Sequence, residues 1–109
     1  MISKNNTNAS LNTAVDDYSL FNKNQKNILK SLLQLSINND VIVSIKDLNK
    51  LTGVTNTTIS SALSFLEKNN IIEQITRRGV IFTGCKINQL KIDDIMVRYQ
   101  TKKTILEKS

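Results

Sequence analysis

The sequence predicts a small α+β domain in which a turn-linked pair of helices is followed by a two-stranded antiparallel ribbon. Three observations support this prediction. Apolar residues recur with a helical period over residues 44–52 and again over residues 55–68. Gly53 separates the two stretches, and glycine permits the left-handed backbone that lets a helix end and the chain turn sharply. After residue 70 the sequence becomes β-branched in two short runs that are joined by a glycine-containing tip.

Length and composition limit the possible classes of protein. A chain of 109 residues suits one domain with a single core, and a hydrophobic fraction of 39% with only 5% aromatics predicts a core of Ile, Leu and Val. The net charge of +6 favours polyanionic partners, because binding them releases counterions. The sequence has no apolar run near the roughly 20 residues that a membrane span needs. With a single cysteine and no visible secretory signal, we expect a cytoplasmic protein with no membrane partner.

The residues that most catalytic and metal sites use are scarce. The chain has no histidine, which is the commonest general base and metal ligand, and one cysteine cannot form a structural zinc site. Its three glycines are isolated, so no phosphate-binding loop is present. The acidic pairs Asp16–Asp17 and Asp93–Asp94 are interpreted as solvated or helix-capping carboxylates. We therefore expect that the protein has no catalytic site, binds no metal and no cofactor, and is not an enzyme.

The N-terminal part divides into an arm and a helix. Residues 1–17 lack any periodicity and are predicted to be a flexible arm. A helix is predicted from about Asn22 to Ile37, with Ile28, Leu29, Leu32 and Leu33 on its apolar side. Its lysines, Lys23, Lys26 and Lys30, would form a solvated face, or Lys23 or Lys26 would contact phosphates. Residues 41–43 are predicted to be a short strand that pairs with the ribbon.

The next helix is predicted to begin after Ser44, a favourable N-cap residue. Its apolar residues Ile45, Leu48 and Leu51 share one face. Lys46 and Lys50 fall on the exposed side. In helix-turn-helix docking the first helix of the pair crosses the nucleic-acid backbone, so these two lysines are candidate phosphate contacts.

The longer helix of the pair is predicted to be capped by Thr55 and to bury one stripe, formed by Ile59, Ala62, Leu63 and Leu66. The opposite face carries only small polar residues: Asn56, Thr57, Ser60, Ser61 and Ser64. Such a face lets a helix enter a major groove, where Asn, Ser and Thr can bond base edges or phosphates; the alternative is an ordinary solvated face. Phe65 lies at the edge of the stripe and is expected to be covered by the C-terminal segment.

The ribbon is predicted to consist of residues 71–76 and 80–83, with Arg77, Arg78 and Gly79 at its tip. Two arginines there suit a phosphate backbone or a narrow minor groove, although charged tips can also simply keep loops soluble. A last helix is predicted from Ile92 to about Glu107, opened by Asp93 and Asp94. Because it is amphipathic, it would pack on the first helix or pair with its twin; we expect a homodimer.

The run Gly53-Val54-Thr55 with Thr58-Ile59-Ser60, Leu63 and residues 66–72 resembles the segment from recognition helix to wing of winged helix-turn-helix regulators, of the multiple-antibiotic-resistance type. The resemblance covers about forty residues. It implies a three-helix core with a small antiparallel sheet (the wing), and double-stranded DNA as the ligand. Asn70 stands where such families often have Gly, and their groove-facing positions often carry Arg or Lys, so the wing and flanks would supply the charge here.

These observations predict a flexible arm at 1–17, a winged helix-turn-helix domain at 18–84 and a helical extension at 85–109 that serves for dimerisation. The expected function is sequence-specific binding of double-stranded DNA by a homodimeric transcription regulator. The small size and the abundance of Asn, Ile and Lys, which have AT-rich codons, are also similar to winged-helix relaxosome accessory proteins of conjugative plasmids. A role in transfer, replication or partition, alongside other DNA-processing proteins, is therefore the alternative. A protein-interaction module without DNA binding is the third possibility.

Overall fold

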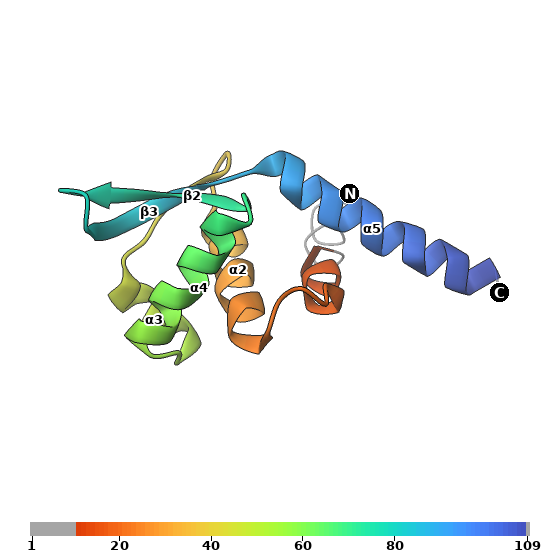
Figure 1. Ribbon diagram of the computed structural model, residues 1–109, viewed down its shortest axis with the longest axis horizontal. Helices are drawn as coiled ribbons and strands as arrows, with labels where there is room; N and C mark the ends of the chain where they lie inside the picture. The colour runs from red at the N-terminus through yellow and green to blue at the C-terminus, as the bar shows by residue number, and fades with distance from the viewer. Residues whose placement is uncertain (1–10, 109) are drawn as a thin grey trace.

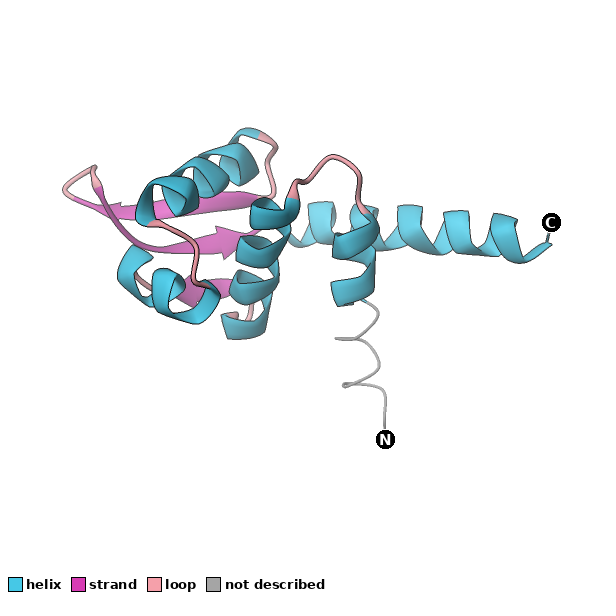
Figure 2. Ribbon diagram, turned by 90° about the horizontal axis from the view of Figure 1, so that it is seen from below, coloured by secondary structure: helices cyan, strands magenta, loops and turns pink. Residues whose placement is uncertain are grey.

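The computed structural model describes residues 11–108, and the side chains of residues 11–102. A helical segment at 11–17 is followed by α2 (Lys23–Leu35), β1 (Asp40–Ile42), α3 (Ile45–Thr52), α4 (Asn56–Lys68), β2 (Ile72–Arg77), β3 (Ile81–Ile87) and α5 (Gln89–Lys108). The strands lie on one side of α2, α3 and α4, and α5 projects away from them (Figures 1 and 2). This α+β arrangement is compatible with a winged helix.

The sheet has three antiparallel strands in the order β1-β3-β2. The short strand predicted at 41–43 is confirmed as β1, and it pairs with the ribbon through Val41 and Cys85. A bulge between Ile75 and Thr76 of β2 leaves Thr83 of β3 as an extra residue in the register. Such a bulge increases the local twist of the hairpin formed by β2 and β3.

The helix boundaries follow the capping signals of the sequence. The Asn22 side chain accepts a hydrogen bond from the Gln25 N–H at 2.8 Å, and the Gln25 side chain accepts one from the Asn22 N–H, which forms a capping box at the start of α2. Ser44 accepts from the Asp47 N–H at 3.1 Å, as predicted for α3. Helix α2 ends at Leu35 rather than at Ile37, and Asn38 and Asn39 that follow it adopt positive φ angles.

The core is built around α4. Its predicted stripe is confirmed, because Ile59, Ala62, Leu63 and Leu66 are all buried. They pack with the buried side chains of α2 and of the inner sheet face, which include Ile28, Leu29, Leu32, Val41 and Cys85. Leu51 was predicted to share one face of α3 with Ile45 and Leu48, and its side chain there is 60% exposed. It lies in the last turn of α3, and beyond Gly53 it is Val54 that enters the core.

The N-terminal segment differs from the flexible arm that the sequence predicted. Residues 11–17 are helical, and Ala14 and Val15 are 1% and 0% exposed. Leu11, Ala14 and Val15 have the helical spacing i, i+3, i+4, so the segment has an apolar side that packs into the core cluster. Residues 1–10 of the predicted arm lie outside the described residues.

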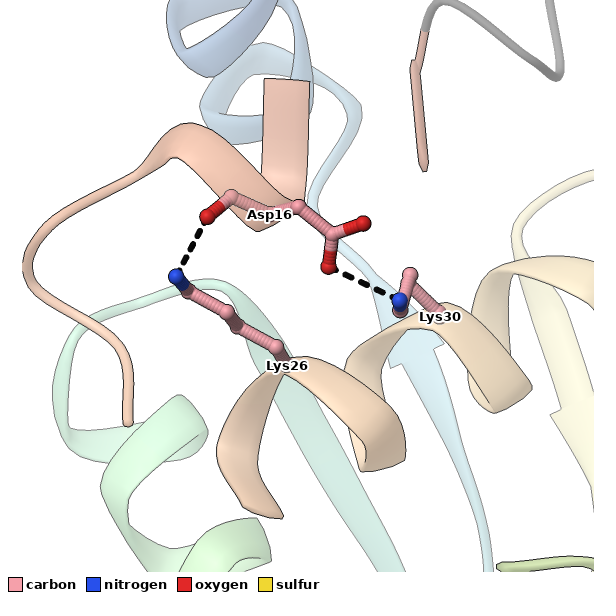
Figure 3. A network of polar contacts seen from close by, with 3 residues as sticks. All are labelled: Asp16, Lys26 and Lys30. Atoms are coloured by element: carbon pink, nitrogen blue, oxygen red, sulfur yellow. Dashed lines mark hydrogen bonds and ion pairs between the residues drawn. The ribbon is translucent and has the colours of Figure 1, made fainter. Parts of the chain in front are cut away.

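Lysines hold this segment against its neighbours. Lys26 donates to the backbone carbonyl of Asp16, and Lys30 donates to the Asp16 carboxylate at 2.8 Å (Figure 3). Lys102 of α5 pairs with Asp17 at 3.3 Å. Cations at the C-terminal end of a helix also compensate its dipole. Lys26 and Lys30 are therefore occupied within the chain, and the alternative that Lys26 serves as a phosphate contact loses its support.

Helix α5 begins earlier than predicted, at Gln89, because the Asn88 side chain accepts from the Leu90 N–H at 3.2 Å. Asp93 and Asp94 were expected to open the helix, and this is wrong, because they lie beyond its first turn. Ile92 and Ile95 are each 3% exposed and belong to the core cluster. Within residues 89–102, Ile92 and Ile95 of α5 are thus used within the chain.

Phe65 is partly buried, and its ring meets that of Phe21 edge-on at 6.1 Å between centroids. Phe21 in turn contacts Tyr18 at 4.8 Å. The aromatic contact of Phe65 therefore comes from the segment before α2, whereas the sequence predicted cover from the C-terminal segment.

The burial of Val15 predicts that residues 11–17 are part of the cooperative fold. Val15→Ala is expected to lower the free energy of unfolding by about 2 kcal/mol, because it removes buried methyl groups. Asp16→Ala is the control on the same segment, and it should cost less than about 1 kcal/mol because its carboxylate pair with Lys30 is half exposed. Urea denaturation measures both. Equal stability of Val15→Ala and the unaltered chain would show that the segment does not contribute to folding.

Candidate nucleic-acid interface

The outward side of α4 brings together all the polar residues that the sequence assigned to it. Asn56, Thr57, Ser60, Ser61 and Ser64 are exposed, and they lie opposite the buried stripe. Within the described part of the chain these five side chains make no hydrogen bond. Their donors and acceptors are therefore available to a ligand, and no long side chain prevents close approach of the helix backbone.

A rigid turn sets the direction in which α4 leaves α3. Gly53 ends α3 with φ of 73°. The Asn49 side chain donates to the Val54 carbonyl at 2.7 Å, and the Thr52 hydroxyl accepts from the Val54 N–H at 3.1 Å. Thr55 then accepts from the Thr58 N–H at 3.4 Å and caps α4. The polar groups of the turn are thus paired within it, which fixes the angle between the two helices.

Lys46 and Lys50 are exposed on α3, which packs beside α4 (Figure 1). They are one helical turn apart, so they lie on the same side of α3. Neither forms an ion pair within residues 11–102. The prediction that both are solvent-facing is confirmed, and their phosphate contact stays a prediction.

The tip of the β2–β3 hairpin carries the arginine pair. Arg77 ends β2, and Arg78 and Gly79 occupy the turn with φ angles of 55° and 74°. The Val80 N–H donates to the Arg77 carbonyl at 3.2 Å and closes the turn. Both arginines are exposed. A positive φ is uncommon for a residue other than Gly, Asn or Asp, so the preferences of the turn do not explain why arginine is found at position 78.

A side-chain clamp fixes the hairpin relative to α4. One oxygen of Glu67, in the last turns of α4, accepts from the Gln74 N–H at 3.0 Å, and the other accepts from the Gln74 side-chain amide at 3.0 Å. Between them the chain turns at Asn70, whose φ is 62°. Sequence reasoning missed this clamp, and the only signal was the presence of Glu and Gln on either side of the Asn69–Asn70 turn. Glu67 and Gln74 are therefore positioning residues for the arginine tip.

A scan against protein-family models gives no match, and searches of curated proteins and of solved structures find no match either.

The remaining chemistry is sparse in the part of the chain that the structure describes. Residues 11–108 contain no group of three or more His, Cys, Asp or Glu side chains that could hold a metal ion. No helix among the same residues combines the length and apolar character needed to cross a membrane. The thiol of Cys85 is fully buried in the core, and burial raises its pKa to about 11. It is a packing residue.

The thiol of Cys85 should be protected in the folded chain and should give stability a specific pH dependence. Its pKa is about 11 in the folded chain against an ordinary 9.0, so the unfolded chain loses the proton first as pH rises. The free energy of unfolding should be unaffected by this thiol below pH 9.0 and fall between pH 9.0 and about 11. The slope is at most about 1.4 kcal/mol per pH unit.

Cys85→Ala provides the control, because it lacks the titrating thiol. Its free energy of unfolding, measured by denaturation at each pH, should fall less steeply over the same pH range. A thiol reagent at neutral pH should label the unaltered chain only after unfolding. Rapid labelling of the folded chain would contradict the assigned burial.

Proposed function

We propose that this chain is a winged helix that binds double-stranded DNA with sequence specificity, α4 being the recognition helix and the β2–β3 hairpin the wing. One arrangement carries the proposal. Helix α4 presents an exposed row of small polar side chains that make no hydrogen bond within the described chain, and hydrogen bonds from Gln74 to Glu67 hold the arginine-tipped hairpin to the same helix. A helix with short side chains on its outer face can lie deep in a major groove. The residue resemblance to winged-helix regulators supports the same function.

The roles of the residues follow from their positions. Asn56 opens α4, and in helix-turn-helix docking the N-terminal residues of the recognition helix reach the base edges. Asn can bond an adenine edge through two hydrogen bonds, whereas Thr57, Ser60, Ser61 and Ser64 suit single contacts to bases or phosphates. Lys46 and Lys50 would anchor phosphates, and Arg77 and Arg78 would hold the backbone or enter the minor groove.

The distribution of charge explains how such a helix could bind without a cation on its own outer face. Phosphate contacts provide most of the affinity, and base contacts provide the sequence preference. In this chain the two tasks fall on separate elements, with the cations on α3 and the wing and the neutral hydrogen-bonding groups on α4. We propose that the biological role is that of a small homodimeric transcription regulator. A protein-interaction module is the competing function, and the uncharged outer side of α4 favours it.

The wing arginines should control the salt dependence of binding. Arg77→Ala combined with Arg78→Ala should weaken binding to DNA and reduce the slope of log K against log salt by about 0.9 for each phosphate that these arginines neutralise. Lys91→Ala combined with Arg98→Ala removes the same charge from α5 and is the matched control, for which the slope should hardly change. Gel shifts or fluorescence anisotropy over a salt series measure both. An equal reduction of slope in the two double variants would assign the effect to net charge.

Asn56 should determine part of the sequence preference. Fragments selected from random DNA would define a preferred site, and Asn56→Ala should reduce discrimination at one base pair of that site by about 1–3 kcal/mol. Thr58→Ala, at a half-buried position beside the cap, is a control for local effects on the helix. Uniform weakening on all sequences would show that Asn56 contacts the backbone. Failure of the unaltered chain to select any sequence would favour the protein-interaction function.

A further inference from the structure

The outer face of the sheet carries an apolar patch that the described elements leave open. Cross-strand partners share a face, so the register places Ile42, Gly84 and Ile75 in one row on the side opposite the buried Val41 and Cys85. Ile42 is 92% exposed and Ile75 is 43% exposed. Ile81, which pairs with Arg77 on the same face, is 44% exposed. We call these residues, with Ile37, the outer sheet patch.

The middle of this patch carries no side chain, because Gly84 occupies it and only glycine fits there. A Cβ on Gly84 would lie 2.1 Å from the carbonyl oxygen of Val41, and its φ is 155°. The backbone of β1 fills the position that a Cβ would take, so no side chain stands between Ile42 on β1 and Ile75 on β2. One face thus contains an exposed side chain, Ile42, beside a position without a side chain.

The charged residues of the same face are of both signs: Arg77 lies opposite Ile81, and three others form a row. The row next to Ile42 and Gly84 consists of Asp40 on β1, Lys86 on β3 and Glu73 on β2. All three are exposed. The face therefore lacks the positive excess of the chain, whose net charge is +6. A polyanion would not be attracted to it, whereas a surface with the same alternation could match it.

We propose that the outer sheet patch is the subunit interface of a two-fold symmetric dimer of this chain. A two-fold axis that runs along the strands, midway between β1 and β3, places Ile42 over the partner's Gly84. The same rotation places Asp40 opposite the partner's Lys86, because Asp40 and Lys86 occupy the same two strands as Ile42 and Gly84. An isologous interface requires a patch that is complementary to itself, and both the apolar row and the charged row meet that condition.

This inference replaces the expected dimerisation through α5 and specifies the dimer of the proposed function. The exposed large apolar residues of α5 among residues 89–102 are Leu90 and Val97, since Ile92 and Ile95 are buried. The outer sheet patch, by contrast, gathers β-branched residues from all three strands, and contiguous exposed apolar surface usually marks an interaction site. The inference rests on the dimeric part of the proposed function and is independent of DNA binding.

The proposed dimer leaves α4 and the hairpin tip free, whereas Arg77 lies on the outer sheet face opposite Ile81. Helix α4 packs on the opposite side of the sheet, and the tip with Arg78 extends beyond it (Figure 1). Each subunit would thus present its own α4 and wing to DNA while the two sheets lie face to face, as stacked sheets do at about 10 Å.

The first test is the molar mass of the full chain, by sedimentation equilibrium from micromolar to hundreds of micromolar concentration. The unaltered chain should dimerise. Ile42→Glu should raise the dimer dissociation constant by at least about tenfold, because it places an unpaired charge in the apolar row. Leu90→Glu is the matched control, with the same substitution at an 80% exposed position of α5, and it should dimerise normally. Circular dichroism confirms folding of each variant.

The second test uses charge exchange to establish the symmetry. Asp40→Lys alone faces the partner's Lys86 with like charge, and Lys86→Asp alone faces the partner's Asp40 with like charge, so both should be mainly monomeric. An equal mixture should form heterodimers, because each contact across the axis then joins opposite charges. Within each variant chain, residues 40 and 86 still carry the same sign of charge in the mixture. Recovery of dimer formation in the mixture can therefore come only from contacts between subunits.

Three outcomes would overturn the inference: a monomer at all concentrations, dissociation by Leu90→Glu with Ile42→Glu still dimeric, or a mixture that associates no better than its components. DNA binding is measured separately on Ile42→Glu with a single half-site. Loss of dimerisation with half-site binding retained supports both proposals. A chain that dimerises as described but binds no DNA would overturn the proposed function and leave this inference standing.

Discussion

The buried stripe of α4 is the constraint on which the rest of the structure depends. Ile59, Leu63 and Leu66 are at most 1% exposed, and they pack with α2 and the sheet in one core. A helix that buries one side exposes the residues on its opposite side to solvent, because its period is 3.6 residues. The row from Asn56 to Ser64 is therefore exposed as a consequence of core packing. The exposure of the polar face of α4 and the stability of the domain therefore both result from burial of the same apolar stripe.

The hairpin depends on α4 in turn. Helix α4 ends at the Asn69–Asn70 turn, where the Ile71 N–H donates to the Leu66 carbonyl at 2.9 Å and the Asn70 N–H donates to the Glu67 carbonyl at 3.0 Å. This arrangement satisfies carbonyls that the end of a helix otherwise leaves free, and it uses Asn in a left-handed conformation where Gly is more usual. The Glu67 clamp then holds β2. Together they fix where the arginine tip lies relative to the polar row.

The sheet and the helices divide the surface of the molecule into parts with different chemistry. The inner sheet face belongs to the core, the outer face is apolar with charges of both signs, and α3 and the wing tip each carry two exposed cations. Surfaces of such different character suit different partners. Because α4 and the outer sheet patch lie on opposite sides of the sheet, association of subunits and contact of α4 with a polyanion need not compete.

The helix pair, the turn between its members and the ribbon could be predicted from local signals. Ser44, Gly53 and Thr55 act through hydrogen bonds and backbone conformation within a few residues of their own position. The helix ends that they set can therefore be predicted from the sequence. The same holds for the polar face of α4, because helical period alone separates it from the buried stripe. Most of the candidate site was therefore predictable, including the exposure of Lys46, Lys50 and the wing arginines.

Several of the features that were missed depend on partners far along the chain. Residues 11–17 carry too few apolar residues to predict a helix, and they become ordered through contacts with α2 and α5. Leu51 has the helical spacing of Ile45 and Leu48, yet its side chain is 60% exposed. The outer sheet patch exists because the register aligns Ile42, Gly84 and Ile75 from three separate strands. The sequence by itself determined which segments form helices and strands and which side of α4 is polar, because those properties are local. Only the tertiary structure decided which surfaces those segments share, because that depends on strand register and on contacts between distant parts of the chain.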